Sequence, residues 1–217
     1  MEVFGCQFPE DRLYDCEATV WVKPYEEHFT LGVTQLYTYL LGRMRMVSPK
    51  PQNTHIQKGK GVVYIESASF SGYVNTPLSG VLLQVNQTVL QNPFVVNKDP
   101  YYEGWIAKLK TTNVQEVETL VSAEALKEKV KAIALERGVR CFSVYPVYKV
   151  SGIGGECPET LKSVEDILER AEKEDVLLLV TDNPRAQQDV PSWVEAHGYH
   201  IVEARFEQAL KYYIIRK

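Results

Sequence analysis

Cys157 is the residue of this chain that is best placed to do chemistry. It lies in the segment Gly154-Gly155-Glu156-Cys157-Pro158-Glu159, between a strand-like run and an amphipathic helical pattern. Proline is favoured at the first position of a helix, so the pattern predicts a helix that begins at Pro158. The amide groups and dipole at a helix N-terminus favour an anion, which biases a thiol there toward the nucleophilic thiolate. The sequence therefore predicts sulfur chemistry at Cys157.

A buried structural role is the alternative for Cys157. Cysteine is among the most often buried residue types and commonly acts as a small apolar filler. The two glycines and the proline favour an exposed turn over a core position. Glu156 and Glu159 oppose thiolate formation, and Lys162, about one turn along the helix, offsets them only in part. The direction of the net pKa shift at Cys157 stays open at this point.

Length and composition describe an ordinary globular protein. The chain has 217 residues, of which 45% are hydrophobic and 24% are charged, enough for one large domain or two small ones. The formal net charge of -4 gives no general case for binding nucleic acid or membranes. There are only 4 cysteines, no apolar run approaches a membrane span, and the N-terminus lacks the features of a secretory signal. We therefore expect a cytoplasmic protein with reduced thiols.

The C-terminal part alternates strand and helix patterns. Residues that favour β-structure predict a strand over 142–150, and apolar residues at helical spacing follow from Pro158. A continuous apolar run over 176–180 is typical of a buried strand, and a second helix is expected to begin over 189–193. The last two expected strands are 200–205 and 212–216. The order β-α-β-α-β-β predicts a compact two-layer α/β sandwich.

The N-terminal part is rich in turn signals and short β-type runs. The expected strands are 20–22, 61–65, 80–85 and 105–109. One helix is expected over 34–41, and another is expected to begin at Ser122, a favourable N-cap, and to end at Gly138. This order indicates a β-rich body followed by a helix. We therefore expect an α+β protein of two domains, 1–138 and 139–217.

The stretch from about Arg140 to Lys217 resembles the TusA/SirA-like sulfur-carrier family. The resemblance is carried by the 154–159 segment, Thr181-Asp182-Asn183-Pro184, Asp189-Val190-Pro191 and Tyr212-Tyr213-Ile214-Ile215-Arg216-Lys217. In that family the cysteine holds sulfur as a persulfide and hands it to a partner, which implies that Cys157 is the carrier residue. The residues that frame it are then Gly154, Gly155, Glu156, Pro158 and Glu159. The family usually has a second proline where Thr160 stands, and often an acidic residue where Ser151 stands.

Residues from about Thr19 to Lys131 resemble the H protein of the glycine cleavage system. The matching pieces are Thr19-Val20-Trp21-Val22, Leu31-Gly32-Val33-Thr34, Val63-Tyr64-Ile65-Glu66-Ser67, Thr76-Pro77-Leu78-Ser79-Gly80, Asn97-Lys98-Asp99-Pro100 and Tyr102-Glu103-Gly104-Trp105-Ile106. The resemblance implies a β-rich barrel-sandwich hybrid with a hairpin that normally presents a lipoyl-bearing lysine. That position falls on Ser69, and no lysine lies between Gly61 and Asn97. A hydroxyl cannot form the lipoyl amide, so we expect no lipoyl cofactor and no role in glycine cleavage.

Two surface features of the H-like part leave alternatives open. Phe70 and Tyr73 belong to the hairpin that contains Ser69, whose sequence differs from that of the family. They either contact a partner or pack on the neighbouring strand. The stretch 28–65 has no acidic residue, although the family is typically acidic there. It is either a docking face for an acidic partner or anionic ligand, or a solvated basic loop. Its basic residues are Arg43, Arg45, Lys50, Lys58 and Lys60.

The other cysteines predict no catalytic or metal site. Cys141 and Cys157 lie at opposite ends of the predicted 142–150 strand, which spans about 27 Å, too far for a disulfide. We therefore expect Cys141 to be buried structure. Cys6 and Cys16 have the option of pairing or of binding a metal, but their spacing matches no zinc pattern.

The leading functional hypothesis is a sulfur-relay protein, a persulfide carrier and not a turnover enzyme. Cys157 receives sulfane sulfur from a donor protein and passes it to an acceptor protein by thiol exchange, so a transient persulfide is the only group it carries. The H-like domain then acts as a docking module. One alternative is a non-catalytic adaptor in which both domains have lost their chemistry. Another is a redox sensor, in which oxidation of Cys157 switches a partner contact.

Overall fold

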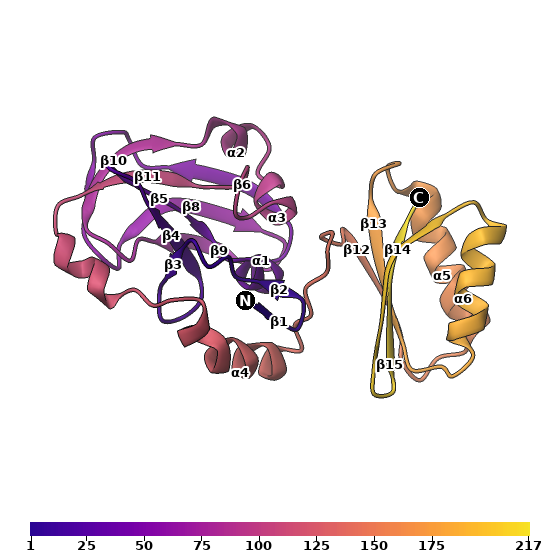
Figure 1. The fold of residues 1–217 in the computed structure, drawn as a ribbon. Coiled ribbons are helices and arrows are strands. Elements are labelled where there is room, and N and C mark those ends of the chain that lie inside the picture. Colours follow the sequence, from indigo (N-terminus) through magenta and orange to yellow (C-terminus); the bar gives the residue numbers. More distant parts are fainter. The chain divides into compact units, whose positions relative to one another are not determined.

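The computed structural model describes residues 1–217 and divides the chain into two compact units, Met1–Cys141 and Phe142–Lys217 (Figure 1). Each unit has its own hydrophobic core. The predicted α+β architecture is confirmed, with a sheet-rich first unit and an α/β second unit. None of the helices combines the length and apolar character needed to cross a membrane.

Two separate sheets form the body of the first unit. One has six strands in the order β3-β4-β5-β11-β10-β7, and the other has three in the order β6-β8-β9. The strands are β3 (Leu13–Tyr14), β4 (Val20–Pro24), β5 (Phe29–Val33), β6 (Met44–Pro49), β7 (His55–Ile56), β8 (Gly61–Ser67), β9 (Ser71–Asn75), β10 (Gly80–Val85) and β11 (Ala107–Thr111). Apolar residues of both sheets, such as Leu31 and Val63, share one core. The outer strands pair on one side only, so the sheets form an open sandwich and not a closed barrel.

Short helices and one hairpin complete the first unit. They are β1 (Glu2–Val3), β2 (Cys6–Gln7), α1 (Gln35–Leu41), α2 (Gln87–Gln91), α3 (Val95–Lys98), the 3-10 helices η1 (Val114–Thr119) and η2 (Glu124–Leu126), and α4 (Lys127–Arg137). Thr34 caps α1 by accepting a hydrogen bond from the Tyr37 amide. The Ser122 hydroxyl accepts one from the Ala125 amide, and Gly138 ends α4 with a φ of 62°. Both helices expected here, 34–41 and the one between Ser122 and Gly138, are confirmed.

A disulfide joins Cys6 to Cys141 across 135 residues of sequence. Both cysteines are fully buried, and the Cys141 amide donates a hydrogen bond to the Phe4 carbonyl. The expectation that Cys141 is buried is therefore confirmed. The expectation of reduced thiols and the option of a Cys6–Cys16 pair are wrong, because the β1–β2 hairpin brings Cys6 to the end of the unit. Cys16 lies exposed between β3 and β4 with a free thiol.

The second unit is a two-layer sandwich with the predicted element order. Its sheet has the strand order β12-β13-β15-β14, with β12 and β13 parallel and the other pairs antiparallel. The elements are β12 (Tyr148–Gly152), α5 (Cys157–Arg170), β13 (Val176–Thr181), α6 (Ala186–Ala196), β14 (His200–Glu207) and β15 (Leu210–Arg216). Both helices cover the same face of the sheet (Figure 1). Every residue of β13 is buried, as its continuous apolar run predicted.

The first half of the predicted 142–150 strand is wrong, because β12 begins only at Tyr148. Side chains hold the preceding segment instead. The Ser143 amide and hydroxyl donate hydrogen bonds of 2.8 and 2.7 Å to the Glu203 carboxylate. The Phe142 ring lies 6.0 Å from the Tyr212 ring. Pro146 lacks the amide hydrogen that a strand needs at this position.

Candidate functional site

The loop before α5 is held in place by three close interactions. Gly152 ends β12 against Thr160, and a β-carbon at Gly152 would lie 2.5 Å from the Thr160 methyl group. The Thr160 hydroxyl donates a hydrogen bond of 3.0 Å to the Glu156 carbonyl. Gly154 has a φ of 70°, and its amide donates a bond of 2.9 Å to the Asp182 carboxylate. The loop is therefore tied both to the first turn of α5 and to the end of β13.

Cys157 is the first residue of α5 and is half-buried, which confirms the predicted position of the helix start. Glu156 precedes it in an extended conformation, and its side chain makes no capping hydrogen bond. Cys157 opens into a groove of about 450 Å³ between α5 and α6. The groove is lined by Cys157, Pro158, Leu161, Lys162, Glu165, Asp189 and Trp193. A small thiol-bearing or persulfide-bearing group has room to reach the sulfur there.

The environment raises the pKa of the Cys157 thiol. Burial is the main cause, and the Asp189 carboxylate adds to it through a hydrogen bond and through its negative charge. The net shift of the Cys157 pKa, whose direction the sequence left open, is therefore upward and favours the protonated thiol. Sequence reasoning missed Asp189 as a site residue. It belongs to the Asp189-Val190-Pro191 motif, but its place beside Cys157 depends on how α6 packs on α5.

The other site residues predicted from the sequence divide into two groups. Pro158 lines the groove beside Cys157. Gly154, Gly155, Glu156 and Glu159 are exposed around the mouth of the loop and do not line the groove. Their part in contacting a partner stays a prediction.

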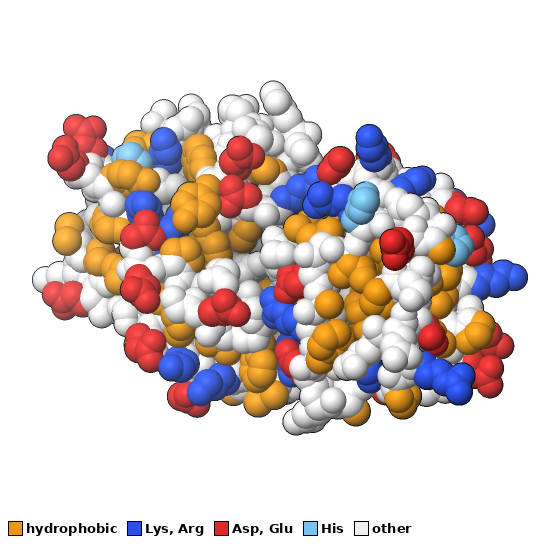
Figure 2. Space-filling model, turned by 45° about the vertical axis from the view of Figure 1, so that its right-hand side comes forward, with side chains coloured by type: hydrophobic (Ala, Val, Ile, Leu, Met, Phe, Trp, Pro, Cys, Tyr) orange, Lys and Arg blue, Asp and Glu red, His pale blue; other side chains and the backbone are white.

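Aromatic side chains continue the surface beyond the groove. The Trp193 ring stacks on the His197 ring at 4.4 Å and lies 5.7 Å from the Tyr199 ring. His197 also pairs with Glu165 at 3.5 Å, which links α6 to α5. Figure 2 shows that the visible face of the second unit combines hydrophobic side chains with histidine and both signs of charge.

The hairpin between β8 and β9 carries Ser69 at its exposed tip. The hairpin is anchored to the end of α1, because the Ser67 hydroxyl and the Ser69 amide both donate hydrogen bonds to the Leu41 carbonyl. The Ala68 amide likewise donates to the Arg43 carbonyl at 3.0 Å. The structure therefore presents the side chain at position 69 on a well-supported turn.

The hairpin aromatic residues pack within the unit. Phe70 packs against the core, as the packing alternative predicted. The Tyr73 ring lies edge-on to Tyr64 at 5.2 Å and covers Gly61, although Tyr73 stays 53% exposed. Tyr73 thus packs on the neighbouring strand and still offers a surface to a partner.

The basic residues of the 28–65 stretch are spread over two places, near β6 and in the turn between β7 and β8. Arg43 lies 4.6 Å over the Phe94 ring, and the Lys58 ammonium donates a hydrogen bond of 2.7 Å to the Thr119 hydroxyl. Arg45 and Lys60 are exposed, and Lys50 is half-buried. A docking role for them stays a prediction.

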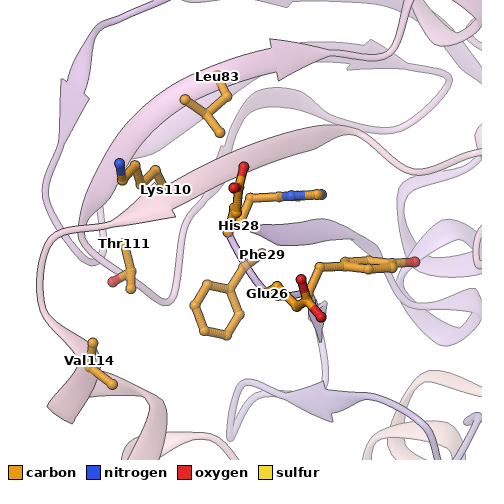
Figure 3. Close-up of a pocket in the computed structure, with 9 residues that line it drawn as sticks. Glu26, His28, Phe29, Leu83, Lys110, Thr111 and Val114 are labelled. Atoms are coloured by element: carbon orange, nitrogen blue, oxygen red, sulfur yellow. The ribbon is translucent and has the colours of Figure 1, made fainter.

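A second cleft, of about 720 Å³, lies in the first unit between the β4–β5 turn, β10, β11 and η1 (Figure 3). The Tyr25 and His28 rings stack at 5.0 Å on its rim, and burial together with the charge of Lys108 lowers the pKa of His28. In the same view the Phe29 ring points away from Leu83, on the side of the cleft where Val114 lies. The cleft contains no cysteine, and the structure holds no cluster of three or more His, Cys, Asp or Glu suited to a metal ion. The groove at Cys157 is therefore the better candidate site.

Two family models match the two units. Residues 12–133 match the model described as Glycine cleavage H-protein, and residues 153–217 match Sulfurtransferase TusA. The chain therefore belongs to the glycine cleavage H-protein family, and a TusA domain follows the H-protein domain in the same chain.

Individual relatives cover the first unit. Glycine cleavage system H protein 5 of Aquifex aeolicus is 41% identical over 145 residues, which are 64% of this chain and 98% of the relative. A probable glycine cleavage system H protein 2 of Saccharolobus solfataricus is 32% identical over 140 residues, 63% of this chain and 95% of the relative. The crystal structure of an H protein from Mycobacterium marinum is 23% identical, with a TM-score of 0.50 over 61% of this chain and 100% of that chain. This last likeness supports the fold alone.

Proposed function

We propose that this protein is a sulfur carrier that holds sulfane sulfur as a persulfide on Cys157 and transfers it to a partner protein. The supporting observation is the position of Cys157, which is the first residue of α5 and opens into a groove. Cys157 lies within residues 153–217, which match the TusA family model. The partners are a sulfur-donor protein and a sulfur-acceptor protein.

The transfer needs no external oxidant or reductant. The Cys157 thiolate attacks the terminal sulfur of the donor persulfide, the sulfur–sulfur bond of the donor breaks, and the donor leaves as a thiolate that takes up the proton lost by Cys157. An acceptor thiolate then attacks the terminal sulfur on Cys157, and Cys157 leaves as a thiolate. Each exchange moves one sulfur atom, so the protein is a stoichiometric carrier.

We propose that the H-protein domain is a docking module without a lipoyl arm. Ser69 occupies the exposed hairpin tip, and a hydroxyl there cannot form the amide that lipoylation requires. The hairpin and the exposed Tyr73 supply the contact surface, and Arg43, Arg45, Lys50, Lys58 and Lys60 favour an acidic partner.

The raised pKa of Cys157 favours a second candidate, a non-catalytic adaptor whose thiol is only a structural remnant. The two candidates differ in whether sulfur loads. We would incubate the protein with a cysteine desulfurase and cysteine, and measure its intact mass before and after reduction. The carrier gains one reductant-labile sulfur atom, Cys157→Ser does not, and Cys16→Ser behaves like the wild type. The absence of any gain on an accessible Cys157 contradicts the carrier and supports the adaptor.

A further inference from the structure

Asp189 is a groove carboxylate that contacts no cationic side chain. Glu165, the other carboxylate lining the groove, contacts the His197 ring nitrogen at 3.5 Å. Asp189 lies in the first turn of α6 and forms no ion pair with any lysine, arginine or histidine. Lys162 lines the same groove but does not pair with Asp189. A negative charge therefore stands beside the sulfur without a counter-charge.

The remaining groups around Cys157 do not supply that counter-charge. At the N-cap of α5 and along the helix they are Glu156, Glu159, Lys162 and Glu165, so three carboxylates surround a single ammonium group. On β15, Tyr213 faces the sulfur, but its hydroxyl donates a hydrogen bond of 3.0 Å to the Ala186 carbonyl and stays neutral there. The mouth of the groove thus carries an excess of negative charge around a half-buried thiol.

We propose that Asp189 restrains Cys157 in the free protein, and that a sulfur-exchange partner releases it by placing a lysine or arginine side chain against the Asp189 carboxylate. A cation at that position removes the field that favours the neutral thiol, so the thiolate forms when the partner is docked. When the partner leaves, Cys157 returns to its less reactive form. The groove therefore selects cationic partners and protects the free thiol from alkylation and oxidation.

This inference rests on the proposed function, but its first test does not need sulfur transfer. We would measure the rate of Cys157 alkylation by iodoacetamide against pH in the full chain with Cys16→Ser, since Cys16 is the other free thiol. Asp189→Asn moves the pH profile to lower pH and speeds alkylation at pH 7 by about three- to tenfold. Asp166→Asn, an exposed position of α5 outside the groove, leaves the profile in place. An unchanged profile in Asp189→Asn overturns the restraint.

The second test concerns the partner cation. Two short peptide persulfides, one with arginine and one with glutamate beside the cysteine, are offered as sulfur donors. The wild type loads from the arginine peptide faster by about three- to tenfold, Asp189→Asn loses this preference, and Asp189→Glu keeps it. Equal loading of wild type and Asp189→Asn from both peptides overturns the proposal while the carrier function stands. If neither peptide loads the wild type, the carrier function fails, and the alkylation profile still decides whether Asp189 restrains the thiol.

Discussion

Gly152 and Thr160 are packed so closely that the backbone of β12 lies directly against the first turn of α5. A β-carbon at Gly152 would lie 2.5 Å from the Thr160 methyl group and 2.7 Å from its hydroxyl oxygen. Thr160 stands where the TusA family usually has a second proline. Its hydroxyl and amide both donate hydrogen bonds to the Glu156 carbonyl, so this chain fixes the start of the helix with hydrogen bonds that proline cannot make.

Gly152→Ala is expected to destabilise the second unit by about 1–3 kcal/mol, because the new methyl group overlaps a short side chain that has little room to move. Thr160→Ala in the same chain removes the overlapping atoms and restores most of the loss. The matched control is Gly155→Ala, whose β-carbon would meet nothing closer than 3.4 Å. Amide hydrogen exchange of second-unit peptides in the full chain measures the effect, and equal protection in the Gly152 and Gly155 variants contradicts the packing argument.

Reduction of the Cys6–Cys141 disulfide is expected to destabilise the first unit by about 2–4 kcal/mol, because the bond closes a loop of 135 residues in the unfolded chain. Denaturant unfolding with and without dithiothreitol, followed by hydrogen exchange of each unit, measures the loss. The double variant Cys6→Ala with Cys141→Ala loses the dependence on dithiothreitol. If the stability of the first unit is the same with and without dithiothreitol, this prediction is wrong.

Ser69→Lys is expected to create a lipoylation site. The substitution places an amine at the exposed tip of the β8–β9 hairpin, in a fold that belongs to the H-protein family. A lipoate ligase then adds lipoyl to the variant and not to the wild type, as intact mass shows. Ser71→Lys, two residues along the hairpin, is the control and stays unmodified. Lipoylation of the wild type overturns the interpretation of Ser69.

Glu203 is expected to make the anchoring of segment 142–147 depend on pH. Burial opposes the charged form, but hydrogen bonds from Ser143 and the charge and hydrogen bond of Arg205 outweigh it and lower the pKa of Glu203. Because the folded pKa lies below the unfolded one, the stabilisation is full above the ordinary pKa of 4.5 and is lost as pH falls through the lowered value. Glu203→Gln therefore costs about 1 kcal/mol near pH 7 and less in acid. We would measure the urea midpoints of the wild type and of Glu203→Gln against pH. A difference between the two midpoints that is the same at every pH contradicts this prediction.

Periodicity allowed much of the fold to be predicted from the sequence. The continuous apolar run of β13 predicted a central strand, because such a strand is buried on both faces. The apolar residues of α5 recur at helical spacing, because only one face of that helix is buried. Most residues of segment 142–147 favour β-structure, yet Pro146 and the tertiary contacts of Ser143 with Glu203 decide its path. Local pattern cannot reveal such distant anchors.

The sequence predicted only those site residues that lie together in one segment of the chain. Cys157 and Pro158 stand together in the sequence, so the start of α5 was predictable. Asp189 comes to the sulfur from another helix, and its effect on the pKa depends on the packing of α6 on α5. The Cys6–Cys141 pair is likewise set by tertiary structure, because 135 residues separate its members.

The most direct test of the carrier function is a peptide-resolved mass spectrum of the protein isolated from its own cells without reductant. We expect a reductant-labile extra sulfur atom on the peptide that contains Cys157, and an unmodified hairpin peptide that contains Ser69. A Cys157 peptide that never carries extra sulfur, together with a lipoyl-sized adduct on the H-protein domain, would contradict this expectation.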